Sequence, residues 1–143
     1  MSKKIALVVW SKTGNTRLMG KAIKDGAEAN GAEVETFKAY NFDIDAAKNY
    51  DCIALGCPAM GAEILEDTEF LPMYEMVKPY LKDKKVFIFG SYGWGDGKWM
   101  RDWEVDALNN GIKLFREPVI AKDKPNDDIL SQLKKIGEDL ANS

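Results

Sequence analysis

The apolar run Ile5–Trp10 (IALVVW) and the polar turn Ser11–Thr16 (SKTGNT) that follows it decide the fold of this chain. The run is rich in β-branched residues and contains no polar position, which is typical of a strand buried on both faces. Apolar residues then recur at helical spacing, at Leu18, Met19, Ala22 and Ile23. This spacing predicts a helix with one buried face, so the chain opens with a strand, a short turn and a helix.

The same alternation continues along the rest of the chain. Further strands are predicted at 33–37, 51–57, 85–89 and within 112–121, and further helices at 70–81, 98–109 and 127–141. Strands that alternate with helices indicate a parallel sheet with helices on both faces, because parallel neighbours need crossover connections. The sequence therefore predicts a three-layer, doubly wound α/β fold. At 143 residues and without a linker, residues 1–143 are expected to form a single domain.

Composition excludes several classes of function. The chain is 45% hydrophobic and 30% charged, as soluble globular proteins are. Its net charge of −3 argues against a nucleic-acid partner. Because it contains no histidine, Ser-His-Asp hydrolysis, Cys-His proteolysis and histidine-ligated metal sites are excluded. The first apolar run is too short for a signal sequence or a membrane span, so a cytoplasmic location is expected.

Two cysteines, Cys52 and Cys57, lie five positions apart in a predicted strand. Residues at that spacing face opposite sides of a strand, so the pair is not expected to form a disulfide. Two thiols are also too few for an iron–sulfur cluster, which needs four ligands. We expect both to be buried structural thiols, and no metal site is predicted.

The loops after the first, third and fourth strands are expected to form any site, since ligands of open parallel sheets bind beyond the carboxyl ends of the strands. The first loop combines hydroxyl and amide side chains with a glycine at the start of a helix: Ser11, Thr13, Gly14, Asn15 and Thr16. Unpaired N–H groups and the helix dipole favour a phosphate there. The alternative is an ordinary helix cap. The spacing of a Walker loop is absent.

The other two loops carry features suited to a flat ring. In the glycine-rich loop 90–97, Trp94 is held between glycines and is suited to stacking, although it could instead fold back onto the core. In the loop after the third strand, Met60 can cover a ring face and Gly61 lets its peptide turn over. Four acids follow, Glu63, Glu66, Asp67 and Glu69, and they form either a docking surface or an ordinary solvated face. Together the three loops predict a site for a phosphorylated flat heterocycle.

Three motifs in the same order resemble the flavodoxins, in particular the short-chain flavodoxins of anaerobic bacteria. They are WSKTGNT at 10–16, GCPAMGAEILED at 56–67 and FGSYGWGDGKWMRDW at 89–103. The resemblance implies the strand order 2-1-3-4-5 and non-covalently bound FMN. It also implies a low-potential one-electron carrier that shuttles between semiquinone and hydroquinone and serves redox partner proteins. The chain would then be an electron-transfer protein and not an enzyme.

The resemblance also assigns roles to residues at the three loops. Ser11, Thr13, Asn15 and Thr16 would bind the phosphate, helped by the backbone of Lys12 and Gly14, and Pro58 and Ala59 would lie along the ribityl chain. Trp94 would stack on the outer ring face, Met60 would pack on the inner side, and Glu63 would accept from flavin N3–H. Backbone groups of Ser91, Gly93 and Gly95 would meet the polar edge of the ring, Tyr92 would also belong to the cofactor site, and the Gly61 carbonyl would turn toward a protonated N5.

Two positions depart from the family pattern, and some alternatives stay open. Lys12 replaces a glycine, so its ammonium either contacts the phosphate or points to solvent, and Asp123 stands where an uncharged ribityl contact is expected.

Basic redox partners would dock near Glu63, Glu66, Asp67 and Glu69, and a monomer is expected. An FMN-dependent reductase is the main alternative. A receiver domain would need an acidic cluster at the end of the first strand, where Val9 and Trp10 stand instead. A cysteine phosphatase would need an arginine soon after Cys57, and the next arginine is Arg101.

Overall fold

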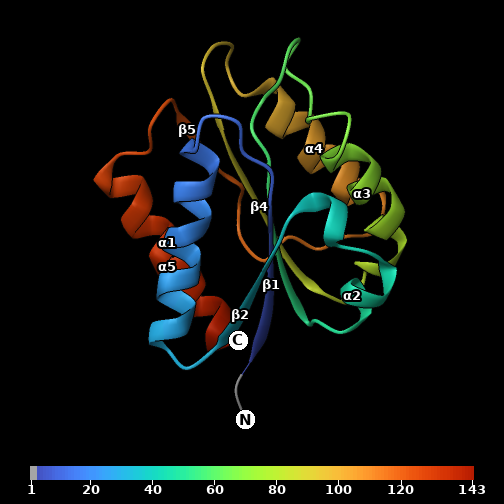
Figure 1. The fold of residues 1–143 in the computed structure, drawn as a ribbon, viewed down its shortest axis with the longest axis vertical. Coiled ribbons are helices and arrows are strands. Elements are labelled where there is room, and N and C mark those ends of the chain that lie inside the picture. Colours follow the sequence, from blue (N-terminus) through green and yellow to red (C-terminus); the bar gives the residue numbers. More distant parts are fainter. Residues whose placement is uncertain (1–2) are drawn as a thin grey trace.

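A computed structural model describes residues 3–143 and contains one five-stranded parallel sheet (Figure 1). Its strands are β1 (Lys4–Val9), β2 (Glu33–Phe37), β3 (Cys52–Gly56), β4 (Lys85–Tyr92) and β5 (Val119–Lys122). The order β2-β1-β3-β4-β5 confirms the predicted fold class. In the register of the sheet, Val8 lies beside Leu55 and Leu55 beside Ile88. The loops that follow β1, β3 and β4 therefore begin at the same edge.

Helices cover both faces of the sheet (Figure 1). One face carries α1 (Asn15–Ala29) and α5 (Asp127–Ala141), and the other carries α2 (Ile44–Lys48), α3 (Phe70–Val77) and α4 (Lys98–Asn109). Each face has its own apolar core, with Cys57 in one and Cys52 in the other. Both thiols are buried and unbonded, which confirms the interpretation of the cysteines, and burial raises the pKa of each.

Two glycines let α1 and α5 touch backbone to backbone. A Cβ atom on Gly26 would overlap the carbonyl oxygen of Lys134, and one on Gly137 would overlap the carbonyl oxygen of Ile23. Both glycines are buried within helices, where glycine is otherwise unfavourable by about 1 kcal/mol relative to alanine. The close approach of the two helices therefore explains why glycine stands at both positions.

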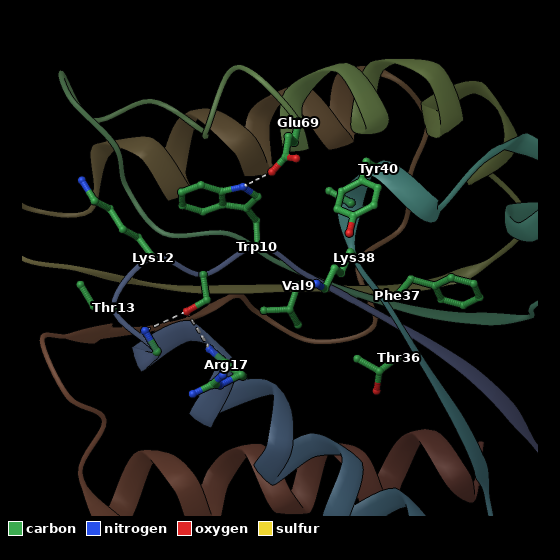
Figure 2. Close-up of a pocket in the computed structure, with 13 residues that line it drawn as sticks. Val9, Trp10, Lys12, Thr13, Arg17, Thr36, Phe37, Lys38, Tyr40 and Glu69 are labelled. Atoms are coloured by element: carbon green, nitrogen blue, oxygen red, sulfur yellow. Dashed lines mark hydrogen bonds between the residues drawn. The ribbon is translucent and has the colours of Figure 1, made fainter.

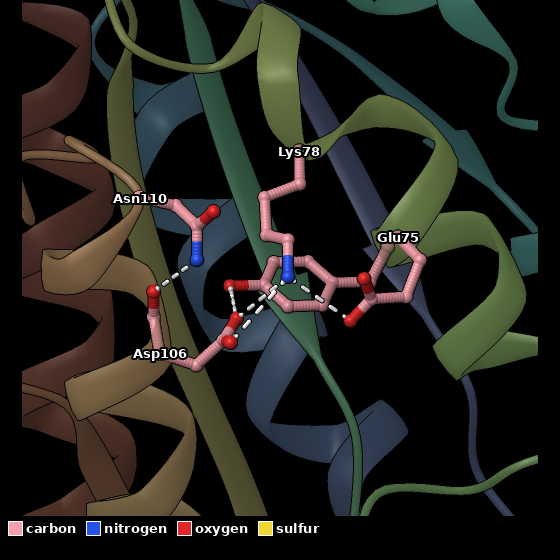
Figure 3. Close-up of polar contacts among 5 residues, drawn as sticks. Glu75, Lys78, Asp106 and Asn110 are labelled. Atoms are coloured by element: carbon pink, nitrogen blue, oxygen red, sulfur yellow. Dashed lines mark hydrogen bonds and ion pairs between the residues drawn. The ribbon is translucent and has the colours of Figure 1, made fainter.

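A polar cluster joins α3 to α4 on the opposite face (Figure 3). Lys78 is only 9% exposed, and its Nζ lies 3.0 Å from Glu75 Oε1 and 3.1 Å from Asp106 Oδ2. The hydroxyl of Tyr74 donates to Asp106 Oδ2 at 2.9 Å, and Asn110 Nδ2 donates to the Asp106 carbonyl at 2.7 Å. Burial and the Asp106 carboxylate raise the pKa of Tyr74. The cluster ties α3 to α4.

Several elements differ from the sequence-based prediction. The short α2 and the 3-10 turns Ala39–Asn41 and Lys78–Tyr80 were not predicted. The helix predicted at 70–81 is α-helical only to Val77, because Pro79 has no N–H with which to continue it. Leu18, expected on the buried face of α1, is 38% exposed, whereas Met19 and Ile23 are buried.

β4 is longer than predicted and changes the position of two candidate residues. It continues through Gly90 to Tyr92, so Ser91 and Tyr92 lie at the end of a strand and not in the glycine-rich loop. Pairing with β5 supports this extension, since Ser91 lies beside Ala121 and Tyr92 beside Lys122. Gly90 is required there because a Cβ would overlap the Cys57 carbonyl oxygen.

The site edge lies on the opposite side of the molecule from the start of β1 and the end of α5 (Figure 1). β1 begins at Lys4 and α5 ends at Ala141, both far from the loops that follow β1, β3 and β4. Within residues 3–143, every helix is too short or too polar to cross a membrane.

Candidate functional site

A cavity of about 290 Å³ opens where the loops after β1, β3 and β4 meet. It is lined by Lys12, Thr13, Asn15, Thr16, Pro58, Ala59, Met60, Gly61, Ser91, Tyr92, Gly93 and Asp123. All of these except Asp123 are among the predicted cofactor-binding residues. The cavity thus brings most of the predicted residues together, and the others lie close by on the same loops.

The first loop presents hydrogen-bond donors at the start of α1. The Ser11 hydroxyl accepts from Gly14 N at 3.1 Å and from Arg17 N at 3.4 Å, so this side chain organises the loop itself. Gly14, with φ of 96°, brings the chain into the helix and provides no side-chain cap. The N–H groups of Asn15 and Thr16 have no acceptor among the described residues. These donors and the helix dipole suit an anion.

A buried hydroxyl pair ties this loop to β4. The Oγ1 of Thr16 and the Oγ of Ser91 lie 2.7 Å apart, and the two residues are 1% and 5% exposed. A hydroxyl can donate one hydrogen bond and accept others, so the pair keeps acceptor capacity toward the cavity. The contact joins two of the predicted loop regions across the floor of the site.

The second loop is a tight turn with left-handed backbone at two positions. Met60 and Ile64 exchange backbone hydrogen bonds of 2.8 and 3.0 Å. Gly61 has φ of 51° and Glu63 has φ of 57°. Nothing lies within 4 Å of the position that a Cβ on Gly61 would occupy, so packing does not require glycine there, whereas the positive φ favours it.

Glu63 links the second loop to the third. Its Oε1 accepts from Lys98 N at 3.1 Å, at the start of α4. Its carboxyl group also packs against Gly95, where a Cβ would overlap it and where φ is 86°. Oε2 of Glu63 has no hydrogen-bond partner within residues 3–143 and can still accept from a ligand. The sequence identified Glu63 and Gly95 as site residues but gave no sign of their contact.

The side chain of Trp94 is exposed to solvent. It is 63% exposed, so the alternative in which it folds back onto the core is wrong. Trp99, which is 1% exposed, enters the core instead, and its Nε1 donates to the Cys57 carbonyl at 3.2 Å. Tyr92 packs against Trp99 with ring centroids 5.4 Å apart. Trp94 thus leaves a large apolar face available beside the cavity.

Glu66 does not belong to an exposed acidic surface, and this prediction was wrong. The residue is 5% exposed, and its carboxylate accepts from the N–H groups of Thr68, Glu69 and Phe70 at 2.8 Å each, and from the Thr68 hydroxyl. Burial raises the pKa of Glu66, but these hydrogen bonds outweigh burial and hold it below its ordinary value. The carboxylate therefore clamps the loop before α3.

Asp123 extends the site to a fourth strand. It follows β5, has φ of 58°, lines the cavity, and its N–H donates to the Tyr92 carbonyl at 2.7 Å. Sequence reasoning placed the site on the loops after three strands and treated Asp123 only as a departure from a family pattern. Its position directly after the carboxyl end of β5 is the signal that could have included it.

Comparison with known proteins relates this geometry to a family. The flavodoxin family model matches residues 7–135. A flavodoxin of Clostridium beijerinckii is 41% identical over 136 residues, which cover 95% of this chain and 98% of the relative. A flavodoxin of Megasphaera elsdenii is 38% identical, with 96% and 98% covered.

The solved structures agree with the sequence relatives. The solution structure of two-electron reduced Megasphaera elsdenii flavodoxin matches with a TM-score of 0.88 at 38% identity, covering 97% of this chain and 99% of that one. Flavodoxins bind FMN and transfer electrons to redox partner proteins, and they are not enzymes. With its sheet order, its three loops and these relatives, the chain belongs to the flavodoxin family.

Proposed function

We propose that FMN lies across the cavity at the carboxyl edge, with its phosphate at the start of α1 and its ring beside Trp94. One observation supports this arrangement above the others: the donor groups of the first loop and the apolar groups Met60 and Tyr92 line a single cavity. A phosphate needs the former and a flat ring needs the latter. The residues present therefore fit FMN.

The start of α1 would bind the phosphate by hydrogen bonds. Asn15 N–H and Thr16 N–H have no acceptor within the described chain, and the positive end of the helix dipole points the same way. The side chains of Thr13 and Asn15 border the cavity and add donors. Ser11 and Gly14 shape the loop from its other side. Lys12 lines this cavity and also the larger space on the other side of the loop, so its position alone does not choose between phosphate contact and solvent.

The second and third loops would hold the ring and the ribityl chain. Pro58 and Ala59 line the cavity between Met60 and the first loop, as ribityl contacts should. Ser91, Gly93 and Gly95 would offer backbone groups to the polar edge of the ring. Glu63 would accept from ring N3–H through the oxygen that Lys98 N leaves unoccupied.

Bound FMN supplies one-electron chemistry, and the residues around it set how easily the ring holds charge. Glycine at position 61 accepts either sign of φ, so its peptide would invert at little cost and present its carbonyl to a protonated ring nitrogen. Glu63 and an apolar lining disfavour negative charge on the ring. Glu66 contributes less than its place in the sequence suggested, because its carboxylate is turned toward backbone N–H groups.

Removing the exposed indole tests the ring position. We expect Trp94→Ala to weaken FMN binding by at least about 1 kcal/mol, roughly fivefold or more in Kd, because a stacking face is lost. The measurement is a titration of the apoprotein with FMN followed by flavin fluorescence. Leu108→Ala is the matched control, since Leu108 is 57% exposed on α4 and outside the cavity. Equal Kd values for Trp94→Ala and wild type would exclude Trp94 from the site.

We also propose that basic redox partners dock beside the ring through the exposed acids of the second loop. With Glu66 removed from this surface, its carboxylates are those of Glu63, Asp67 and Glu69. Glu69 already accepts from Trp10 Nε1 at 2.8 Å, so Asp67 is the most freely exposed of the three. Charges of this kind act mainly on the rate of association.

The docking proposal predicts a rate that depends on salt and on Asp67. Electron transfer to a basic haem protein such as cytochrome c should slow as ionic strength rises. Asp67→Asn should reduce the rate about two- to fivefold at low salt, the effect of one exposed charge pair. Asp83→Asn removes an exposed charge just before β4, away from the site edge, and should leave the rate unchanged. Identical rates for the two variants would contradict the proposal.

We further propose that residues 1–143 work as one FMN-binding domain, as a monomer, in the cytoplasm. A single sheet with an apolar core on each face supports the one-domain arrangement. The two buried, unbonded thiols are in keeping with a reducing compartment.

A further inference from the structure

A second and larger cavity lies on the other side of the first loop. Its volume is about 490 Å³, and it separates that loop and the start of α1 from the segment after β2 (Figure 2). It is lined by Val9, Trp10, Ser11, Lys12, Thr13, Gly14, Arg17, Thr36, Phe37, Lys38, Ala39, Tyr40 and Glu69. Met60, Asn15, Thr16 and Ser91, which border the proposed FMN cavity, do not line it. Lys12 and Thr13 border both cavities, and from them the second cavity extends toward Phe37 and Lys38, away from the proposed FMN position.

The floor and one wall of this second cavity are apolar and fixed. Val9, Phe37 and Ala39 come from strand ends and the adjoining turn. Trp10 forms a wall, and its Nε1 donates to Glu69 Oε1 at 2.8 Å (Figure 2). Because this hydrogen bond holds the edge of the indole, the orientation of the ring face is set before any ligand arrives. Such a preorganised aromatic face suits a second flat ring.

Cations without carboxylate partners surround the same space. Figure 2 shows Arg17 on the α1 side and Lys38 on the β2 side of the floor, with Lys12 at the outer edge of Trp10. None of the three forms an ion pair among the described residues, whereas Arg101 pairs with Asp96 at 3.0 Å. The three positive charges thus gather around one cavity although the chain as a whole is negative, with a net charge of −3. Unpaired cations on two sides of one cavity favour an anion between them.

We propose that this second cavity binds a small aromatic anion, with its ring against Trp10 and its phosphate or carboxylate between Arg17 and Lys38. The volume lies within the usual range for small-molecule sites, roughly 300–1,000 Å³. An apolar floor with a few convergent charged groups is the ordinary composition of such sites. Guanidinium and ammonium groups bind carboxylates and phosphates through charge-assisted hydrogen bonds.

The experiment uses the FMN-loaded protein, so that the FMN phosphate site is filled, and follows backbone amide and indole N–H signals by NMR. Phenyl phosphate is the ligand that combines ring and anion. Inorganic phosphate provides the anion alone and benzyl alcohol the ring alone, and benzoate tests whether a carboxylate replaces the phosphate. We expect phenyl phosphate to saturate shifts at the Trp10 indole N–H and the Lys38 amide, at least about tenfold more tightly than either half-ligand.

Matched variants separate this site from general attraction to positive charge. The double change Arg17→Gln and Lys38→Gln should weaken phenyl phosphate binding at least about tenfold. Lys113→Gln removes one exposed, unpaired lysine elsewhere and should leave the affinity unchanged. Equal affinity in the double variant, or equal affinity for phenyl phosphate and inorganic phosphate, would overturn the proposal. Release of FMN, visible as a change of absorption, would show binding at the FMN phosphate site and would overturn it too.

Discussion

Gly26→Ala is expected to destabilise the protein by about 3 kcal/mol, although alanine favours a helix over glycine by about 1 kcal/mol. The added methyl group would overlap the carbonyl oxygen of Lys134, and backbone at a helix crossing cannot move aside as a flexible side chain can. The two helices must therefore separate and lose apolar burial. The measurement is the free energy of unfolding from chemical denaturation, with FMN absent and again with FMN saturating.

The control for this change is Ser131→Ala, an exposed position on α5. It should change the free energy of unfolding by no more than about 0.5 kcal/mol. Gly137→Ala should behave like Gly26→Ala, because its methyl group would overlap the Ile23 carbonyl oxygen at the same crossing. A Gly26→Ala variant as stable as wild type would contradict this expectation, because it would mean that α1 and α5 accommodate the added methyl group without loss.

Glu66→Gln is expected to remove about 3 kcal/mol of stability at neutral pH, because three backbone N–H groups lose a charged acceptor. An amide presents one oxygen where the carboxylate presents two, so at least one N–H is left facing an NH₂ group. The effect belongs to folding and not to partner docking. Electron-transfer rates of the FMN-loaded variant should therefore stay close to wild type.

The stabilising effect of Glu66 should also depend on pH in a defined direction. Its pKa is lower in the folded protein than the ordinary value of 4.5, so the folded state binds this proton more weakly than the unfolded state does. The contribution is therefore complete above about pH 4.5 and is lost as pH falls through the depressed folded pKa. The stability difference between wild type and Glu66→Gln should be constant near neutrality and shrink below that point.

Asp67→Asn serves as the reference for this pH series, because Asp67 is the exposed neighbour of Glu66. Its stability curve should run parallel to that of wild type over the whole range. If the difference between Glu66→Gln and wild type persisted undiminished to pH 2, a carboxylate clamp would not be its cause.

The parallel sheet could be predicted because the burial of each strand follows from its local sequence, whereas the strand order was implied by the resemblance to flavodoxins. The run at 5–10 is apolar at every position, and a parallel strand covered on both faces is the arrangement that needs such a run. The apolar stripe of α5 also predicts its buried face correctly, since three of its four members are buried. Its members are Ile129, Leu133, Ile136 and Leu140. The prediction that Leu18 is buried was wrong, because the buried face of α1 is narrower than the distribution of its apolar residues suggests.

Most of the site followed from the loops, while the roles of single side chains did not. Glu66 and Asp67 are adjacent acids, and only the N–H groups ahead of α3 turn one of them inward. Trp94 and Trp99 differ likewise, because Trp99 is buried and donates to the Cys57 carbonyl, whereas Trp94 is exposed. Such partners are distant in sequence and come together only after folding. An acid placed shortly before a helix start was the local signal for Glu66.

The position of the start of β1 and the end of α5 has a practical consequence for attaching this protein to another protein or to a surface. β1 starts and α5 finishes at the edge away from the cofactor loops. A fused enzyme, an affinity tag or an electrode linker attached beyond either element would leave the proposed FMN cavity uncovered.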